Sequence, residues 1–310
     1  MSNCKELEES YGNAMRAVCP GGFKLQEGKM VTESGISALD SLLDKVYRDT
    51  GFDFREYKRG TITRRLERRL HATGAKTYPD YMQFLDVHQE EYESLIDYLT
   101  INVSGFFRNP YTFQQISSLV LPELVSGKRA KGQQNLRFWS TACACGQEPY
   151  SIAILITDFL RNSLKDFDIS IYATDISRYG LHRAKAGVYS PNEVVGLSPT
   201  TLANYFTRQS EDYVVNGAIR QMVRFSYFDL ASRATPHFGS MDCIFCCNVL
   251  IYLQKSLQEK VLEMLYDSLA IPGYLILGEA ETPTNNLDGK LDCLDSKVKI
   301  YEKNGESDNI

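Results

Sequence analysis

The sequence has no run of about 18 apolar residues, the length that a membrane-spanning helix needs, so we expect no membrane insertion. Its N-terminal stretch, MSNCKELEESYGNAM, has early acidic residues and no apolar core. This is not the pattern of a secretory signal, and we expect a cytoplasmic location. Histidine is scarce, with four residues in the whole chain. A zinc site would need a second Cys or His pair at ligand spacing, so we expect no metal site.

The chain contains cysteines, but the sequence does not have the features of a disulfide-stabilised secreted protein. Without a secretory signal, we expect free, mostly buried thiols. Cys243 and Cys246 lie in one apolar run, where alternate side chains of a strand face opposite sides of a sheet. The eight cysteines are Cys4, Cys19, Cys143, Cys145, Cys243, Cys246, Cys247 and Cys293.

Neither sign of charge is in large excess: the 310 residues carry a net charge of -5, and 43% are hydrophobic. These values are ordinary for a globular protein and argue against a general nucleic-acid binder. The length allows one large domain or two small ones. We expect a polar extension over residues 1–33, a helical domain over 34–120, an α/β domain over 121–304 and a tail over 305–310.

The first half of the chain has the periodicity of helices. Ser34 or Ser37 can cap a helix that runs to Arg48 and ends at Gly51. A second helix is expected at 59–73, a third from Thr77 and a fourth at about 89–100.

From residue 136 the pattern alternates between strands and helices, which predicts a parallel sheet with crossover helices. Strands are expected at 136–140, 169–174, 242–246 and 273–278, and helices at 149–161, 177–186 and 254–269. One stretch interrupts the alternation. Residues 213–219 predict a hairpin with an Asn-Gly turn, followed by a strand at 222–227. We therefore expect a small antiparallel insert at about 188–227.

Three of the predicted strands end in small or polar residues, and ligands bind outside the carboxyl ends of strands in open α/β sheets. The first is followed by Gly146 alone, without the other glycines of a dinucleotide fingerprint. Glu148 then stands where a helix dipole also favours an acid. Asp175 can accept hydrogen bonds from a ribose diol or cap the next helix. Asn248 and Tyr252 follow the third strand, where chemistry would occur.

Residues 53–76 carry a net charge of +5, from eight basic and three acidic side chains. On a helix, Ile62, Leu66 and Leu70 form the buried stripe, and two arginine pairs, 64 with 68 and 65 with 69, fall on exposed faces. Like charges four residues apart are mildly unfavourable. The helix therefore indicates an acidic partner, although a solvated surface remains the alternative. Arg108 stands beside two phenylalanines and needs an anion partner, such as the carboxylate of a cofactor or substrate.

Seven segments together resemble the CheR family of chemotaxis receptor methyltransferases, over about residues 35–303. They are NVSGFFR at 102–108, WSTACACGQEPYS at 139–151, ATDIS at 173–177, VRFSYFDL at 223–230, FCCNVLIYL at 245–253, PGYLILGEAE at 272–281 and KIYEK at 299–303. The resemblance implies an α/β fold: a Rossmann-like S-adenosylmethionine-dependent methyltransferase domain with a small antiparallel β insert, preceded by a small all-helical domain. It also implies an enzyme that methylates receptor glutamates for sensory adaptation.

By the same resemblance, Arg108 and Glu148 would hold the methionine end of S-adenosylmethionine, and Asp175 the ribose. Arg108 and Tyr252 would flank the methyl group and the incoming glutamate as catalytic residues, and the product would be S-adenosylhomocysteine. Asp229 and Leu230 would meet the adenine, and Asn102, Ser104, Asn248 and Val249 would complete the pocket. The basic helix would meet the acidic methylation region in the cytoplasmic helices of a methyl-accepting receptor through Arg59, Arg64, Arg65, Arg68 and Arg69. We expect a monomer that binds no nucleic acid.

Several residues depart from the family pattern. Ala142 stands in place of a glycine, Cys145 in place of a small hydroxyl residue and Gln147 in place of an acid. Cys247 stands where the family has arginine, and Ile271-Pro-Gly replaces Pro-Gly-Gly. The β insert also looks short. A catalytically weak or silent cofactor-binding regulator is therefore the main alternative, followed by a methyltransferase for nucleic acid or a small molecule. A nicotinamide-dependent enzyme is least favoured because the fingerprint glycines are missing.

Overall fold

The computed structural model describes residues 33–100, 102–232 and 236–304, with side chains from residue 38 onward. The chain divides into two units, Met1–Ser37 and Ala38–Ile310, and all side-chain contacts described below lie within the second. None of the helices in the described ranges is long and apolar enough to cross a membrane.

The first described elements are four helices with a core of their own. Their bounds are α2 (Glu33–Thr50), α3 (Arg59–Thr73), α4 (Tyr78–Val87) and α5 (Glu91–Leu99). Ile62, Leu66 and Leu70 are buried as predicted, and α3 ends at Gly74 in the left-handed conformation with φ +76°. Thr77 caps α4 in a reciprocal box with Asp80. We call the apolar residues buried among these helices the helical core.

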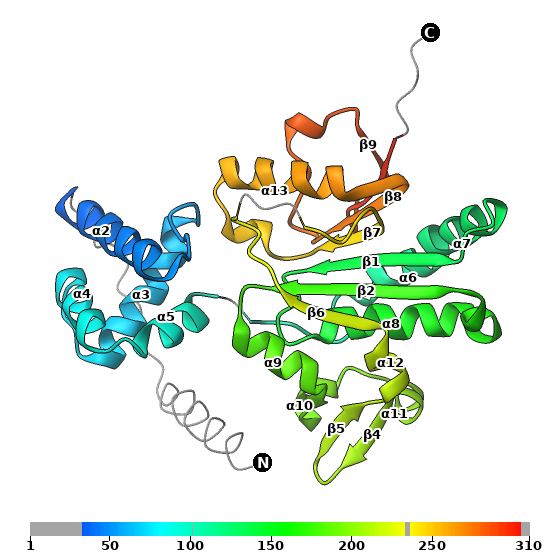
Figure 1. Cartoon of the computed structure of the whole chain (residues 1–310), viewed down its shortest axis with the longest axis horizontal. Helices are drawn as coiled ribbons and strands as arrows, with labels where there is room; N and C mark the ends of the chain where they lie inside the picture. The colour runs from blue at the N-terminus through cyan, green and yellow to red at the C-terminus, as the bar shows by residue number, and fades with distance from the viewer. Residues whose placement is uncertain (1–32, 101, 233–235, 305–310) are drawn as a thin grey trace. The chain divides into compact units, whose positions relative to one another are not determined.

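The main sheet has seven strands in the order β6-β2-β1-β7-β8-β10-β9 (Figure 1). The first five run parallel, and β10 is antiparallel to both of its neighbours. The bounds are β1 (Asn135–Thr141), β2 (Asp168–Asp175), β6 (Val223–Tyr227), β7 (Met241–Cys246), β8 (Leu269–Leu277), β9 (Leu291–Asp295) and β10 (Ile300–Lys303). The four predicted strands and the parallel arrangement are confirmed.

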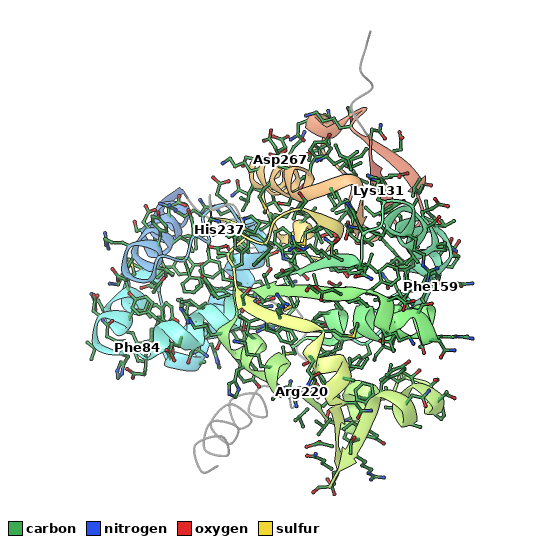
Figure 2. All side chains as sticks on the ribbon, turned by 45° about the vertical axis from the view of Figure 1, so that its right-hand side comes forward. Phe84, Lys131, Phe159, Arg220, His237 and Asp267 are labelled. Carbon is green, nitrogen blue, oxygen red and sulfur yellow. The ribbon has the colours of Figure 1, made fainter. Side chains whose placement is uncertain are left out.

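Helices cover both faces of this sheet, and side chains fill the space between them (Figures 1 and 2). One face packs on α6 (Pro110–Gln115), the π-helical turn η1 (Ile116–Val120), α7 (Leu121–Ala130) and α8 (Gln147–Leu160). The other face packs on α13 (Lys255–Ser268), and we call this cluster the α13-side core. Cys243 contributes to the first cluster and Cys246 to the second, as the alternation along β7 predicts. All six described cysteines are free.

The antiparallel insert is present, but two details of its prediction are wrong. Its sheet has the order β3-β5-β4, with β3 (Val188–Tyr189), β4 (Phe206–Gln209) and β5 (Asp212–Val215). The hairpin turns at residues 210–211, because Asn216 instead precedes the short helix α12 (Gly217–Gln221). The expected end of the insert at 227 is also wrong, since Val223–Tyr227 pairs in parallel with β2 as an edge of the main sheet.

The remaining described elements are short or connect the strands. They are η2 (Arg161–Asp166), α9 (Arg178–Ala186), α10 (Pro191–Val194), α11 (Pro199–Tyr205), η3 (Leu250–Tyr252) and η4 (Asn285–Leu287). The predicted helices at 149–161, 177–186 and 254–269 correspond to α8, α9 and α13.

Candidate cofactor pocket at the carboxyl edge of the sheet

A pocket opens at the carboxyl ends of β1, β2 and β7. The structure brings most of the predicted site residues to it. Those that line the pocket are Asn102, Ser104, Arg108, Glu148, Asp175, Asn248, Val249 and Tyr252.

The loop after β1 is a tight turn that lies close to α9. Ala142, Ala144 and Gly146 all have positive φ, at 51°, 48° and 90°. A side chain at Gly146 would place its Cβ 2.8 Å from the Cβ of Ala184, so the loop has no room there for anything but hydrogen. Small residues therefore let the α9 backbone and the loop meet, and the two alanines line the pocket.

Asp175 ends β2 and is buried, with 6% of its surface exposed. Its carboxylate accepts hydrogen bonds from the backbone N–H of Ala144 at 2.8 Å and of Ser177 at 2.7 Å. Burial raises the pKa of Asp175, and these donors oppose that shift. Ser177, not Asp175, caps α9 by accepting from the N–H of Gly180. Asp175 lines the pocket, and each carboxylate oxygen can accept a further hydrogen bond from a ribose diol.

Glu148 lies in the first turn of α8 and lines the same pocket. Ser140 Oγ donates a hydrogen bond to its Oε1 at 2.7 Å. Burial raises the pKa of Glu148 to about 7; nearby Glu281 adds to the rise, while Ser140 and Arg108 oppose it. A carboxylate held in this way suits a cation that arrives with a ligand, because the cation restores the charged form.

The carboxylate of Glu281 binds the backbone of the loop after β7. Glu281 lies in the motif at 272–281, but the sequence did not indicate this role. This carboxylate is 3% exposed. It accepts hydrogen bonds from the backbone N–H of Asn248 and of Gly278, both at 2.8 Å, and of Ile251 at 3.2 Å. Asn248 itself has φ +60°. Glu281 therefore fixes the loop that carries Asn248, Val249 and Tyr252, which line the pocket.

The segment before α6 closes another side of the pocket. Asn102 Nδ2 donates to Ser177 Oγ at 3.1 Å, and Ser177 Oγ donates to Asp97 of α5 at 3.2 Å. Arg108 is exposed at the pocket wall, and its Nη1 donates to the carbonyl of Val103 at 3.3 Å. Within the described ranges no carboxylate forms an ion pair with Arg108, so its charge is available to an anion.

Two predicted residues do not line the pocket. Asp229 and Leu230 follow β6, the neighbour of β2, but Asp229 accepts a hydrogen bond from the backbone N–H of Ala231 at 2.8 Å and Leu230 packs on the α13-side core. Four lining residues that the sequence did not single out come from the part of the chain before residue 101. They are Tyr57, Thr61, Leu99 and Thr100.

Two family models match the chain. The S-adenosylmethionine-binding domain of CheR methyltransferases matches residues 102–300, and the all-alpha domain of CheR methyltransferases matches residues 37–100. The chain belongs to the CheR methyltransferase family. The two matched ranges meet at residues 100–102, whereas we expected the helical domain to reach 120. This agrees with the packing of α6, η1 and α7 on the sheet.

Relatives of this CheR-family chain cover most of its length. Chemotaxis protein methyltransferase 1 of Pseudomonas aeruginosa is 34% identical over 233 residues, which are 74% of this chain and 84% of that protein. Chemotaxis protein methyltransferase 2 of Vibrio cholerae is 33% identical over 243 residues, which are 77% of this chain and 83% of that protein. An uncharacterized 104.1 kDa protein of Rhodobacter capsulatus is 33% identical over 232 residues, and the chain spans 24% of its length.

Cys247, which stands where the CheR family has arginine, lines the pocket. Burial raises the pKa of its thiol, and the carboxylates of Glu148 and Glu281 add to the rise. The side chain is therefore a neutral thiol beside two acids. Because residue 247 carries no positive charge, it lacks the electrostatic attraction by which an arginine would lower the raised pKa of Glu148.

The basic helix α3 of this CheR-family chain has only one of its two predicted exposed arginine pairs. Arg65 donates to the carbonyls of Tyr98 at 2.7 Å and Thr100 at 3.1 Å, and Arg69 is paired with Glu91 at 2.5 Å. The expectation that they face solvent is wrong, because both sit half-buried against α5. Arg64 and Arg68 are exposed, and Arg59 forms an ion pair with Asp40.

Proposed function

We propose that this CheR-family methyltransferase methylates glutamate side chains in the cytoplasmic helical region of chemotaxis receptors, and that it works in the cytoplasm as a monomer. The observation that carries the proposal is the convergence of Arg108, Glu148, Asp175 and Tyr252 on one pocket. The relatives named chemotaxis protein methyltransferase support the choice of substrate.

The residues of the pocket fit S-adenosylmethionine. Glu148 is half-buried and, within the described residues, forms no ion pair, so it suits the α-ammonium group, and exposed Arg108 suits a carboxylate. Asp175, at the end of β2, suits the ribose diol. Asn102, Ser104, Asn248 and Val249 enclose the remaining space. We still propose that Asp229 and Leu230, which follow β6, contact the adenine.

The reaction needs little acid–base chemistry from the protein. S-adenosylmethionine supplies a methyl group on a positively charged sulfur, already activated toward nucleophiles. A glutamate carboxylate has a solution pKa of about 4.3 and is ionised at neutral pH, so no general base is required. Arg108 and Tyr252 would orient the carboxylate for in-line attack, and the pocket would shield the reacting groups from part of the solvent.

The outer face of α3 is the proposed contact for the receptor. Lys58 and Arg64 are exposed, and within the described part of the chain neither forms an ion pair. The acidic methylation region of a receptor would meet these charges together with Arg59 and Arg68. Arg65 and Arg69, predicted as receptor contacts, both bind α5. They would therefore hold α3 in place and would not contact the receptor directly.

The test is transfer of tritiated methyl groups from S-adenosylmethionine to receptor-rich membranes, followed by base treatment. Glutamate methyl esters release the label as methanol, whereas methyl groups on nitrogen do not. Base-labile label in receptor bands supports the proposal. Cofactor binding without any transfer would favour the silent regulator, and label in nucleic acid or in base-stable form would contradict the proposed substrate.

A further inference from the structure

Tyr57 belongs to the segment between α2 and α3, yet it lines the cofactor pocket beside Asp175 and Tyr252. Its backbone is fixed to the methyltransferase domain. Tyr57 forms an antiparallel bridge with Leu253, and the N–H of Lys58 donates to the carbonyl of Tyr252 at 2.8 Å. The helical domain thus delivers one aromatic side chain to the pocket through a short pairing with the loop that follows β7.

A second set of hydrogen bonds reinforces this pairing. The N–H of Gln254 donates to the carbonyl of Glu56 at 2.8 Å, and its side-chain Nε2 donates to the carbonyl of Arg55 at 2.9 Å. Residues 55–58, just before α3, are therefore anchored to residues 252–254, at the end of the pocket loop. The position of Tyr57 follows from the backbone and does not depend on the side chain alone.

The Tyr57 ring is also held on two sides. It packs partly against the helical core and partly against the α13-side core. The ring of Phe54 meets it edge to face, with 5.3 Å between centroids. Because the ring is already immobilised, a ligand that packs against it loses little binding free energy to the ordering of the side chain.

The phenol hydroxyl remains a donor. Burial raises the pKa of Tyr57, and the charges of Asp229 and Asp175 raise it further, so the hydroxyl keeps its proton at neutral pH. In the ranges that the structure describes, the hydroxyl has no hydrogen-bond partner. Tyr57 is half-buried and lines the pocket, so this hydroxyl is free to donate a hydrogen bond to a ligand there.

We propose that Tyr57 is a cofactor-binding residue contributed by the helical domain, whose ring covers the adenosine end of S-adenosylmethionine and whose hydroxyl donates a hydrogen bond to it. The inference rests on the cofactor pocket of the proposed function. The place follows from Asp175, which ends β2 and lines the pocket together with Tyr57, since the ribose diol is expected at that carboxylate. The methionine side, by contrast, is lined by Glu148 and Arg108.

Two ligands separate the two ends of the pocket. S-adenosylhomocysteine has both the adenosine and the amino-acid end, and methylthioadenosine has the adenosine end alone. Isothermal titration of the full chain is expected to show that Tyr57→Phe weakens both ligands by the same factor, about fivefold for one neutral hydrogen bond. Glu148→Gln is expected to weaken S-adenosylhomocysteine and leave methylthioadenosine unchanged.

A matched control separates contact from stability. Tyr92 Oη donates to Asp49 at 2.5 Å within the helical domain, and Tyr92 does not line the pocket. Tyr92→Phe is expected to lower the melting temperature while both affinities stay as in the wild type. Unchanged affinities in Tyr57→Phe would overturn the inference, as would a loss confined to S-adenosylhomocysteine or an equal loss in Tyr92→Phe. Failure of the wild type to bind S-adenosylhomocysteine would instead overturn the pocket itself.

Discussion

At the scale of single residues, the pocket depends on carboxylates whose surroundings give them different tasks. Asp175 and Glu281 each accept backbone N–H groups and fix loops. Glu148 accepts one hydroxyl and has a pKa of about 7. The sequence indicated Asp175 and Glu148 because they follow strand ends. It could not indicate Glu281, because two of the three N–H groups that it binds come from a loop at least 30 residues earlier.

The pKa of Glu148 makes cofactor binding depend on pH. Only the ionised carboxylate attracts an ammonium group, so affinity for S-adenosylhomocysteine is expected to rise from pH 6 to about 8 and then level off, as titration calorimetry at each pH would show. Methylthioadenosine, which lacks that group, serves as the flat reference. A pH slope that persists in Glu148→Gln would contradict this role.

The same shift affects the stability of the unliganded protein. The folded-state pKa of about 7 lies above the ordinary value of 4.5, so the folded state binds more protons between those values. The contribution of Glu148 to the free energy of unfolding therefore falls as pH rises through that window. A bound ammonium group reverses the effect, because it stabilises the ionised form.

Removing Glu281 tests the support of the loop after β7. Glu281→Ala leaves three backbone N–H groups without an acceptor, and hydrogen bonds to a charged group contribute about 1.5–3 kcal/mol each. We expect chemical denaturation to show a loss of about 3 kcal/mol, with S-adenosylhomocysteine affinity lowered tenfold or more. Glu279→Ala, at an exposed position two residues earlier, is the control. Normal cofactor affinity in Glu281→Ala would show that the loop after β7 keeps its conformation without this carboxylate.

At the scale of elements, hydrophobic periodicity predicted the helices and the buried parallel strands because those patterns depend on local sequence. The errors arose where a partner element decides. Asn216-Gly217 has the composition of a hairpin turn but begins α12, and Arg65 and Arg69 face α5 because that helix offers carbonyls and Glu91. No pattern within 59–73 reveals which side of α3 a neighbouring helix covers.

The turn after β1 tolerates no side chain at Gly146. Gly146→Ala would combine an unfavourable φ of 90° with a Cβ 2.8 Å from that of Ala184, and we expect a loss of about 2–3 kcal/mol in denaturant unfolding. Gly127→Ala in α7 meets nothing within 4 Å and is expected to stabilise by about 0.5–1 kcal/mol. Equal effects of the two variants would mean that the loop does not approach α9 so closely.

The outer face of α3 is expected to contribute to receptor recognition and not to cofactor binding. Arg64→Glu should lower receptor methylation several-fold, with the larger deficit at low salt, while its affinity for S-adenosylhomocysteine stays unchanged. Lys255→Glu makes the same charge change at an exposed position on α13. Equal losses of methylation in both variants would indicate a general charge effect and contradict a specific site on α3.

At the scale of the whole molecule, the helical and sheet domains build one pocket together. Helices α3 and α5 supply Thr61 and Leu99, and the bridge between Tyr57 and Leu253 ties the segment before α3 to the loop after β7. The resemblance to CheR proteins implied both domains and their order. It did not reveal that the connection between α2 and α3 reaches the pocket, because Tyr57 stands outside every motif that carried the resemblance.

The central claim is that this chain methylates glutamates on receptor helices through the described pocket. Mass spectrometry of a receptor cytoplasmic fragment, incubated with S-adenosylmethionine and either the wild type or Glu148→Gln, tests it most directly. We predict methyl esters on glutamates with the wild type and a strong reduction with the variant. Unmodified glutamates with a wild type that binds S-adenosylhomocysteine, or undiminished methylation by Glu148→Gln, would contradict the account.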